Sequence, residues 1–268
     1  MARPNLSYLK SLILLLVGLP FGVLTGLTAL AASVFALPAV RALLGLRPER
    51  AAGVGLAVTF AAAAGALLSY GQHGTLPAAL ALLLAVCSVV GAAWGTRLAA
   101  RFPNAGRLGW LWGTLTAAGG LTMLAQGLGM PGHAHPWHMP FAPRPLLYLE
   151  AVPLALAVGV FSRLIGLGGV LLVPALIYGL GMPPRPAQGA AILVLALASL
   201  PGLLIHARRG AVEPQAATWL SAGAIFGGLA GAYWANTALS DARLLALFGA
   251  ALTAAGLTLL WRRDGAEA

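Results

Sequence analysis

One segment interrupts the apolar run between residues 146 and 180: Ser162-Arg163-Leu164-Ile165-Gly166-Leu167-Gly168-Gly169-Val170-Leu171-Leu172-Val173-Pro174. It combines three glycines with a single arginine. In an apolar chain this pattern indicates a membrane helix broken near its middle, because backbone N–H groups freed at that depth are tolerated only around a cavity. An arginine inside the bilayer costs about 2.5–3.5 kcal/mol, so it needs a partner or a ligand. A bound anion would supply one.

The composition is that of a membrane protein. Of 268 residues, 60% are hydrophobic and 8% charged, whereas a soluble domain has roughly 25% charged residues. Apolar stretches of about 20 residues recur along the chain, so we predict an all-α polytopic protein forming a single membrane transporter domain over residues 1–268 in the lipid bilayer. The net charge of +10 comes from arginines in short connections rather than on one amphipathic face. This distribution favours control of topology over binding to nucleic acid.

Catalytic and metal-binding patterns are weak. No nucleophile–base pair or nucleotide motif is present, and the six acidic residues fall at or outside the ends of the apolar stretches. We therefore expect no enzyme activity and no cofactor. His133, His135 and His138 have a spacing that can bind zinc or nickel, but no carboxylate or cysteine lies near them. An exposed loop without metal is the preferred interpretation.

A constant offset of 136 residues relates the two halves of the chain. It pairs prolines, glycines and an arginine in step: Pro38 with Pro174, Gly53 with Gly189, Gly74 with Gly210, Gly91 with Gly227, Arg107 with Arg243, and Gly113 with Gly249. We predict two homologous repeats, 10–127 and 146–262, joined by the proline-rich linker 128–145, which cannot be helical.

Each repeat reads as a broken or re-entrant helical segment followed by three transmembrane helices. The broken segments are 11–44 and 146–180, and the full spans are 51–70, 77–99, 108–126, 187–206, 214–236 and 242–261. If both broken segments return to the side from which they enter, twelve basic residues lie on one side and three on the other. That asymmetry predicts an inner (plasma) membrane protein with both termini cytoplasmic. Three full spans per half is an odd number, so the repeats would be inverted, as in many secondary transporters.

Small residues suggest where helices touch. Glycines recur at four-residue spacing in Gly223-Gly227-Gly231 and Gly91-Gly95. Such spacing allows close contact between helices in lipid, and we assign these glycines to packing.

The interrupted segment supplies the main candidate binding site. Ser162 offers a hydroxyl, Arg163 a positive charge, and Gly166, Gly168 and Gly169 a backbone that can approach a small oxyanion. The alternative is that the glycines only let helices touch, while Arg163 extends to the membrane interface. Three further groups of polar residues are weaker candidates. Gln188 and Ser33 are each as well explained by interhelical contact as by ligand binding, and for Thr25, Thr28 and Thr59 packing is preferred.

These features resemble the sulfite exporter TauE/SafE family, also called toluene sulfonate uptake permeases. The resemblance rests on Gly166-Leu167-Gly168-Gly169-Val170-Leu171-Leu172-Val173-Pro174, on Gly210-Ala211-Val212-Glu213 and on Leu239-Ser240-Asp241-Ala242-Arg243-Leu244. It implies a transporter of two homologous halves that moves sulfite, sulfonates or related anions with a proton or sodium gradient. The chain departs from the family in having Gly168-Gly169 where three glycines are common, and Gly189-Ala190 where Thr-Ser is common.

Two rival functions remain open at this stage. A passive anion channel on the same scaffold would carry anions only down their gradient. A scaffold subunit of a larger membrane assembly would carry none.

Overall fold

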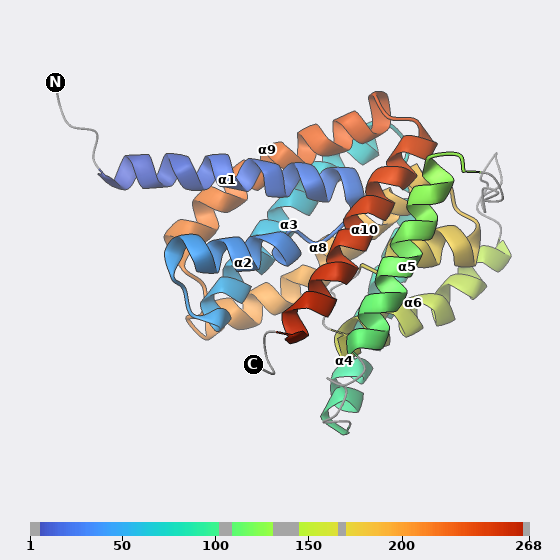
Figure 1. The fold of residues 1–268 in the computed structure, drawn as a ribbon, viewed down its shortest axis with the longest axis horizontal. Helices are drawn as coiled ribbons and strands as arrows, with labels where there is room; N and C mark the ends of the chain where they lie inside the picture. The colour runs from blue at the N-terminus through green and yellow to red at the C-terminus, as the bar shows by residue number, and fades with distance from the viewer. Residues whose placement is uncertain (1–5, 102–108, 131–144, 166–169, 265–268) are drawn as a thin grey trace. The chain divides into compact units, whose positions relative to one another are not determined.

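The computed structural model describes residues 6–101, 109–130, 145–165 and 170–264. These residues form helices joined by short turns and include no strand, which confirms the predicted all-α class. The helices, labelled in Figure 1, are α1 (Leu6–Thr28), α2 (Ala32–Leu44), α3 (Pro48–Gln72), α4 (Ala78–Arg101), α5 (Gly109–Gly127), α6 (Pro145–Ile165), α7 (Leu172–Pro174), the π-helical turn η2 (Ala175–Gly179), α8 (Pro184–Arg208), α9 (Pro214–Thr237) and α10 (Asp241–Asp264).

Five helical stretches are long and apolar enough to cross a bilayer: Lys10–Thr28, Pro48–Gln72, Ala78–Leu98, Pro184–Arg208 and Asp241–Thr258. A shorter apolar stretch, Leu146–Ser162, lies within α6. The helix α9 is not among the five although it has 24 residues. Its buried residues are alanines and glycines apart from Leu220, and such small side chains contribute little hydrophobicity.

The predicted break in the first apolar segment is confirmed. Helix α1 ends at Thr28 and α2 begins at Ala32, with Ala29 in the left-handed region at φ 53°. In the second segment α6 ends at Ile165, and helical structure resumes at Leu172. A π-helical turn, Ala175–Gly179, follows Pro174 directly. The glycines between these helices and most of the proline-rich linker lie outside the described residues.

The chain folds into two compact units. Unit 1 comprises Met1–Leu76 and Ile192–Ala238, and unit 2 comprises Pro77–Ala191 and Leu239–Ala268. Unit 1 therefore contains α1, α2, α3, α9 and most of α8. Unit 2 contains α4, α5, α6, α7, η2, α10 and the start of α8.

In unit 1, α1 and α9 lie side by side and run in the same direction (Figure 1). A Cβ added to Gly18, Gly22 or Gly26 would lie 2.2–2.4 Å from a carbonyl oxygen of α9. Gly223, Gly227 and Gly231 face α1 just as closely. This confirms the packing role predicted for the glycines of α9, because any side chain there would force the backbones apart.

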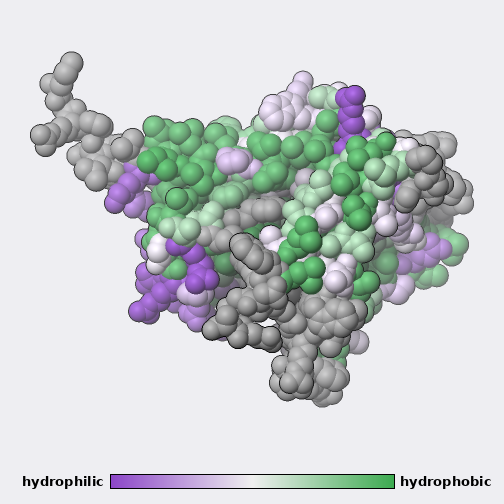
Figure 2. All heavy atoms as spheres, in the orientation of Figure 1, coloured by the Kyte–Doolittle hydropathy of each residue, from purple (hydrophilic) through white to green (hydrophobic). Residues whose placement is uncertain are grey.

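The outward side of these two helices is apolar. Figure 2 shows mostly hydrophobic residues over α1 and α9. The large apolar side chains that α1 and α9 expose include Leu12, Leu16, Ile225, Phe226 and Trp234, which are 40–63% exposed. Such a surface suits contact with lipid acyl chains.

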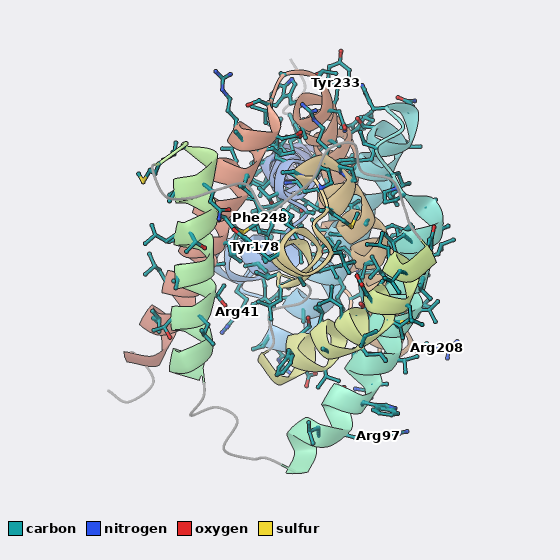
Figure 3. All side chains as sticks on the ribbon, turned by 90° about the vertical axis from the view of Figure 1, so that its right-hand side faces the viewer. Arg41, Arg97, Tyr178, Arg208, Tyr233 and Phe248 are labelled. Atoms are coloured by element: carbon teal, nitrogen blue, oxygen red, sulfur yellow. The ribbon has the colours of Figure 1, made fainter. Side chains whose placement is uncertain are left out.

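The basic side chains of unit 1 gather at one end, here called the arginine end. Arg50, near the start of α3, forms an ion pair with Glu213, which precedes α9. At the other end of the unit, Thr75 donates a hydrogen bond to Asn236. Figure 3 shows Tyr233 near the top of the view, above both Arg41 and Arg208. The described basic residues of the arginine end are Lys10, Arg41, Arg47, Arg50, Arg208 and Arg209.

In unit 2, α5 and α10 run antiparallel at very short range. Glycines at seven-residue spacing, Gly113, Gly120 and Gly127, face α10, and Gly249 and Gly256 face α5. The second close pair is α4 with α6, where a Cβ on Gly159 would lie 2.3 Å from the Ser88 carbonyl oxygen. The predicted packing role of Gly91 is confirmed by its position against the Leu156 carbonyl.

Candidate functional site

The residues predicted from the interrupted segment are described only in part. Ser162 lies in the last turn of α6 and is partly exposed. The backbone of Arg163 belongs to the same helix, but its side chain lies outside the described residues, as do Gly166, Gly168 and Gly169 entirely. Their role as an anion site stays a prediction.

Gln188 lies near the start of α8 and is 1% exposed. It takes part in an interaction within the chain, as a buried amide must. This position is compatible with both interpretations of its role, ligand binding and interhelical contact.

The break between α1 and α2 is described completely. Ala29, Leu30, Ala31 and Ala32 are 0–4% exposed, so the turn lies inside the protein rather than on its surface. The Ala29 N–H donates to the Thr25 carbonyl, which closes the last turn of α1. Positive φ at an alanine is strained and persists only where the surroundings impose it.

The N-terminus of α2 is capped from another helix. Ala31 holds the N-cap position and provides no side-chain hydrogen bond. The Ser33 N–H instead donates to Oγ1 of Thr59 in α3, at 2.9 Å, and that hydroxyl donates to the Gly55 carbonyl. Gly55 permits this approach, since an added Cβ would lie 3.2 Å from the Ser33 Cβ. Ser33 is therefore fixed against the middle of α3.

Two further hydroxyl groups, those of Thr28 and Tyr70, bond to the backbone near the break. Oγ1 of Thr28 donates to the Leu24 carbonyl and accepts the Leu30 N–H. The Tyr70 hydroxyl, fully buried, donates to the Gly26 carbonyl at 3.3 Å. The Tyr70 hydroxyl thereby satisfies a carbonyl in the last turn of α1, as a buried helix terminus requires.

Thr25 differs from its neighbours. It is 0% exposed, and its Oγ1 has no hydrogen-bond partner among the described residues. Thr25 continues the stripe Leu14, Val17, Phe21, which packs with α2 and α3. Helical spacing therefore puts Thr25 on the buried face of α1, which packs against α2, α3 and α9.

The break places the N-terminus of α2 inside the protein. The N-terminus of a helix carries a partial positive charge and unpaired N–H donors, which favour negative ligands. Of the residues that the structure describes around it, 24–34 and 51–70 include no lysine or arginine. The polar groups described there are neutral, and the N–H groups of Leu30, Ser33 and Val34 already donate within the protein.

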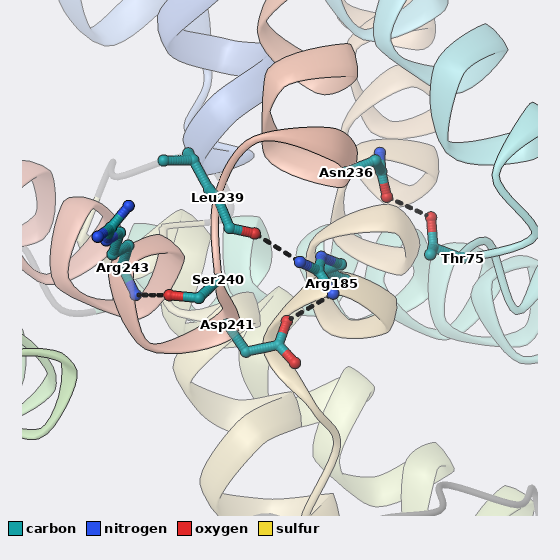
Figure 4. Close-up of polar contacts among 7 residues, drawn as sticks. All are labelled: Thr75, Arg185, Asn236, Leu239, Ser240, Asp241 and Arg243. Atoms are coloured by element: carbon teal, nitrogen blue, oxygen red, sulfur yellow. Dashed lines mark hydrogen bonds and ion pairs between the residues drawn. The ribbon is translucent and has the colours of Figure 1, made fainter.

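Sequence reasoning missed one polar cluster, in unit 2. Arg185 at the start of α8 forms an ion pair with Asp241 and donates to the Leu239 carbonyl (Figure 4). Ser240 accepts the Arg243 N–H at the start of α10. Leu239 to Leu244 form one of the motifs quoted above from the sequence, but Asp241 was not paired with Arg185 there. The opposite charges at the starts of two predicted spans were the sequence feature that could have indicated this ion pair.

Comparison with known proteins identifies the family. The family model described as "Sulfite exporter TauE/SafE" matches residues 2–123 and 151–268. Proteins named "Probable membrane transporter protein" from Xylella fastidiosa strains 9a5c and Temecula1 are each 28% identical over 250 residues, covering 92% of both chains. No solved structure gives a significant match. The chain thus belongs to the sulfite exporter TauE/SafE family and is a membrane transporter.

Proposed function

We propose that this transporter moves small sulfur-containing anions, sulfite or sulfonates, across the cell inner membrane by secondary transport coupled to protons or sodium. The observation that carries the proposal is the buried break between α1 and α2, where a helix N-terminus begins inside the protein. Broken helices of this kind present their positive ends to anionic substrates in secondary transporters. The family description adds the sulfur chemistry.

The inverted repeat is part of the proposal, and the contact between α5 and α10 supports it. An added Cβ on Gly120 would lie 2.7 Å from the Gly249 carbonyl, and one on Gly256 would lie 2.8 Å from the Gly113 carbonyl. The offset of 136 maps Gly113 onto Gly249 and Gly120 onto Gly256. The contact of Gly120 with Gly249 and the contact of Gly256 with Gly113 are therefore equivalent under the repeat. A self-complementary antiparallel pair implies a two-fold axis perpendicular to the helices. For spanning helices that axis lies in the membrane plane.

A second pair of contacts repeats in the same way. Gly22 of α1 faces the Ala224 carbonyl and the Gly228 nitrogen of α9. Gly159 of α6 faces the Ser88 carbonyl and the Ala92 nitrogen of α4. The α9 and α4 residues are related by 136 positions, and the two glycines by 137. One extra residue before Gly159, offset by one fewer residue between Gly159 and Pro174, accounts for the difference, because Pro38 and Pro174 are again 136 positions apart.

The charge distribution supports a cytoplasmic arginine end. Helix α1 starts at the arginine end, because it runs parallel to α9, and α2 returns the chain to that end before α3. The α1–α2 segment therefore behaves as a re-entrant hairpin in unit 1. All described basic residues of unit 1 lie at the arginine end. The positive-inside rule then assigns this end, and the N-terminus with it, to the cytoplasm.

The proposed substrate-binding residues are those expected from the sequence: Ser162, Arg163, Gly166, Gly168, Gly169, Gln188 and Ser33. Arg163 would neutralise the anion, and the hydroxyls and N–H groups would orient its oxygens.

Uptake of labelled sulfite and ethanesulfonate by proteoliposomes tests the proposal. We expect accumulation above the external concentration when a proton or sodium gradient is imposed, and loss of transport in Arg163→Gln. The exposed Arg209→Gln is the matched control and should transport normally. Strictly downhill flux would contradict the coupling to an ion gradient. Unchanged transport by Arg163→Gln would contradict the proposed binding site.

A further inference from the structure

We infer that the C-terminal end of α8 binds an anionic phospholipid, with Arg208 on the headgroup phosphate and Leu204 and Ile205 against the acyl chains. The inference goes beyond the proposed function, because it uses the placement of α8 across the membrane and not the transported substrate. It gives a ligand to an arginine that the charge distribution used only to assign topology.

One face of α8 is exposed over its last two turns. Pro201, Leu204, Ile205 and Arg208 recur at helical spacing, so they lie on one side of the helix, and all four are exposed. Leu204 and Ile205 are each 49% exposed. Because α8 is long and apolar enough to cross the bilayer, this face changes from apolar to basic where the span ends. The boundary between acyl chains and headgroups has the same order.

The backbone at the end of α8 does not need Arg208. An arginine at a helix C-terminus can bond to the last carbonyls. Here the Ala211 N–H donates to the His206 carbonyl, and Gly210 has φ 63°. The Gly210 N–H donates to the Ala207 carbonyl, which completes a Schellman motif. The Arg208 side chain has no hydrogen bond or ion pair among the described residues, so its donors are available to a ligand.

The charge around this site is positive. Residues 200–213 contain Arg208 and Arg209 and one acidic residue, Glu213. Glu213 already pairs with Arg50 of α3. A guanidinium binds two phosphate oxygens at once, and an anionic headgroup complements the remaining positive charge. A zwitterionic lipid has the same phosphate, but its ammonium group is repelled by the neighbouring arginine. The site therefore prefers phosphatidylglycerol to phosphatidylcholine.

The end of α2 has the same residue types in a less suitable order. Leu43 and Leu44 are exposed there, but they follow Arg41 in a helix that runs toward the arginine end. The leucines therefore lie on the headgroup side of that arginine. Only in α8 do the exposed apolar residues precede the arginine by one turn, about 5.4 Å along the axis.

The test measures which lipid lies at this site with a local probe. In a Cys87→Ser background, Ala207→Cys places a bimane fluorophore on an exposed position beside Arg208. The protein is reconstituted in phosphatidylcholine containing phosphatidylglycerol, and each lipid in turn carries bromine on its chains, which quenches the fluorophore on contact. We expect phosphatidylglycerol to be enriched about fivefold at the probe over its share of the bilayer. Arg208→Gln should lower the enrichment below about twofold.

Arg47→Gln is the matched control for charge. Arg47 is exposed at the same end of unit 1, and its side chain also has no partner among the described residues. In the first two turns of α3, which follow it, no large apolar side chain is exposed. The variant removes the same charge and should leave the enrichment unchanged. Leu204→Ser with Ile205→Ser should instead weaken quenching by both lipids, because the apolar contact with their chains is lost.

Soluble sn-glycerol 3-phosphate separates a lipid site from a site for a free phosphate ester. It should not displace brominated phosphatidylglycerol from the probe, and displacement would overturn the inference. Equal quenching by the two lipids in the protein with Arg208 intact would also overturn it, as would an equal loss of enrichment in Arg208→Gln and Arg47→Gln. Uptake of sulfur anions is measured separately. Enrichment without uptake would refute the proposed function alone, and uptake without enrichment would refute only the lipid site.

Discussion

Arg185 and Asp241 form a partly buried ion pair, with 3.5 Å between Nη1 and Oδ1, that joins the start of α8 to the start of α10. The two side chains are 29% and 19% exposed. The same guanidinium donates to the Leu239 carbonyl, so one arginine holds both the turn before α10 and its first residue (Figure 4). The pair lies within unit 2 and connects segments distant in sequence.

Removing one partner of this pair should destabilise the protein measurably. Asp241→Asn leaves the Arg185 charge partly buried and without its counter-ion, and we expect a loss of about 1–2 kcal/mol, between the values for exposed and fully buried pairs. The measurement is reversible unfolding in mixed micelles, with Arg185→Gln and the double variant completing a thermodynamic cycle.

The pair of Arg50 with Glu213 provides a control at the same separation. Its atoms are also 3.5 Å apart, but its side chains are 53% and 37% exposed. Glu213→Gln should therefore cost well under about 1 kcal/mol, because solvent screens the charges. Equal losses in Asp241→Asn and Glu213→Gln would show that burial does not govern the strength of the two pairs.

Adjacent glycines in α5 should respond in opposite directions to alanine. A Cβ on Gly120 would lie 2.5 Å from the Thr253 nitrogen of α10, whereas one on Gly119 would have nothing within 4 Å. Gly120→Ala must push α5 and α10 apart, and we expect a loss of about 1–3 kcal/mol. Gly119→Ala should stabilise by up to about 1 kcal/mol, because alanine favours the helix.

Thermal unfolding of the two alanine variants in the same detergent checks this prediction. Each variant is the control for the other, since both add one methyl group to the same helical turn. A neutral Gly120→Ala would mean that the close contact between α5 and α10 is looser than the structure has it.

The hydroxyl of Thr59 should matter more than its packing. Thr59→Val keeps the shape of the side chain but leaves the Ser33 N–H without its cap, and we expect a loss of about 0.5–2 kcal/mol. Thr218 is the control, because it is exposed and its hydroxyl bonds only to the Pro214 carbonyl of its own helix. Thr218→Val should change stability by less than about 0.5 kcal/mol in the same unfolding assay.

These contacts mark the limit of what the sequence could predict. The glycine spacing in α9 indicated that another helix would approach closely, and it does. The sequence does not identify α1 as the partner, because a stripe of small residues can accommodate any helix that packs closely against it. Span boundaries followed well from the apolar runs: the expected span 214–236 is the helix Pro214–Thr237.

The polar contacts were harder to predict for a physical reason. Thr25, Thr28 and Thr59 have the same side chain, yet their hydroxyls differ. That of Thr28 bonds within its own helix, that of Thr59 caps a neighbour, and that of Thr25 has no partner among the described residues. Which bond a threonine makes depends on the backbone opposite it. The pairing of Arg185 with Asp241 likewise depends on how two connections meet, which composition and charge counts do not encode.

The re-entrant course of α1 and α2 predicts the side on which exposed residues of unit 1 can be labelled. In a background with Cys87→Ser, which removes the only cysteine, Arg41→Cys and Arg209→Cys should both react with a membrane-impermeant maleimide only from the cytoplasmic side. Both residues are exposed at the arginine end, Arg41 in the last turn of α2 and Arg209 between α8 and α9. Gln72→Cys, exposed at the opposite end of α3, should react only from outside. Inverted and right-side-out vesicles give the two accessibilities, and denatured protein gives full labelling as the control. Reaction of Arg41→Cys from the same side as Gln72→Cys would mean that α1 and α2 cross the membrane together, and the re-entrant hairpin would then be wrong.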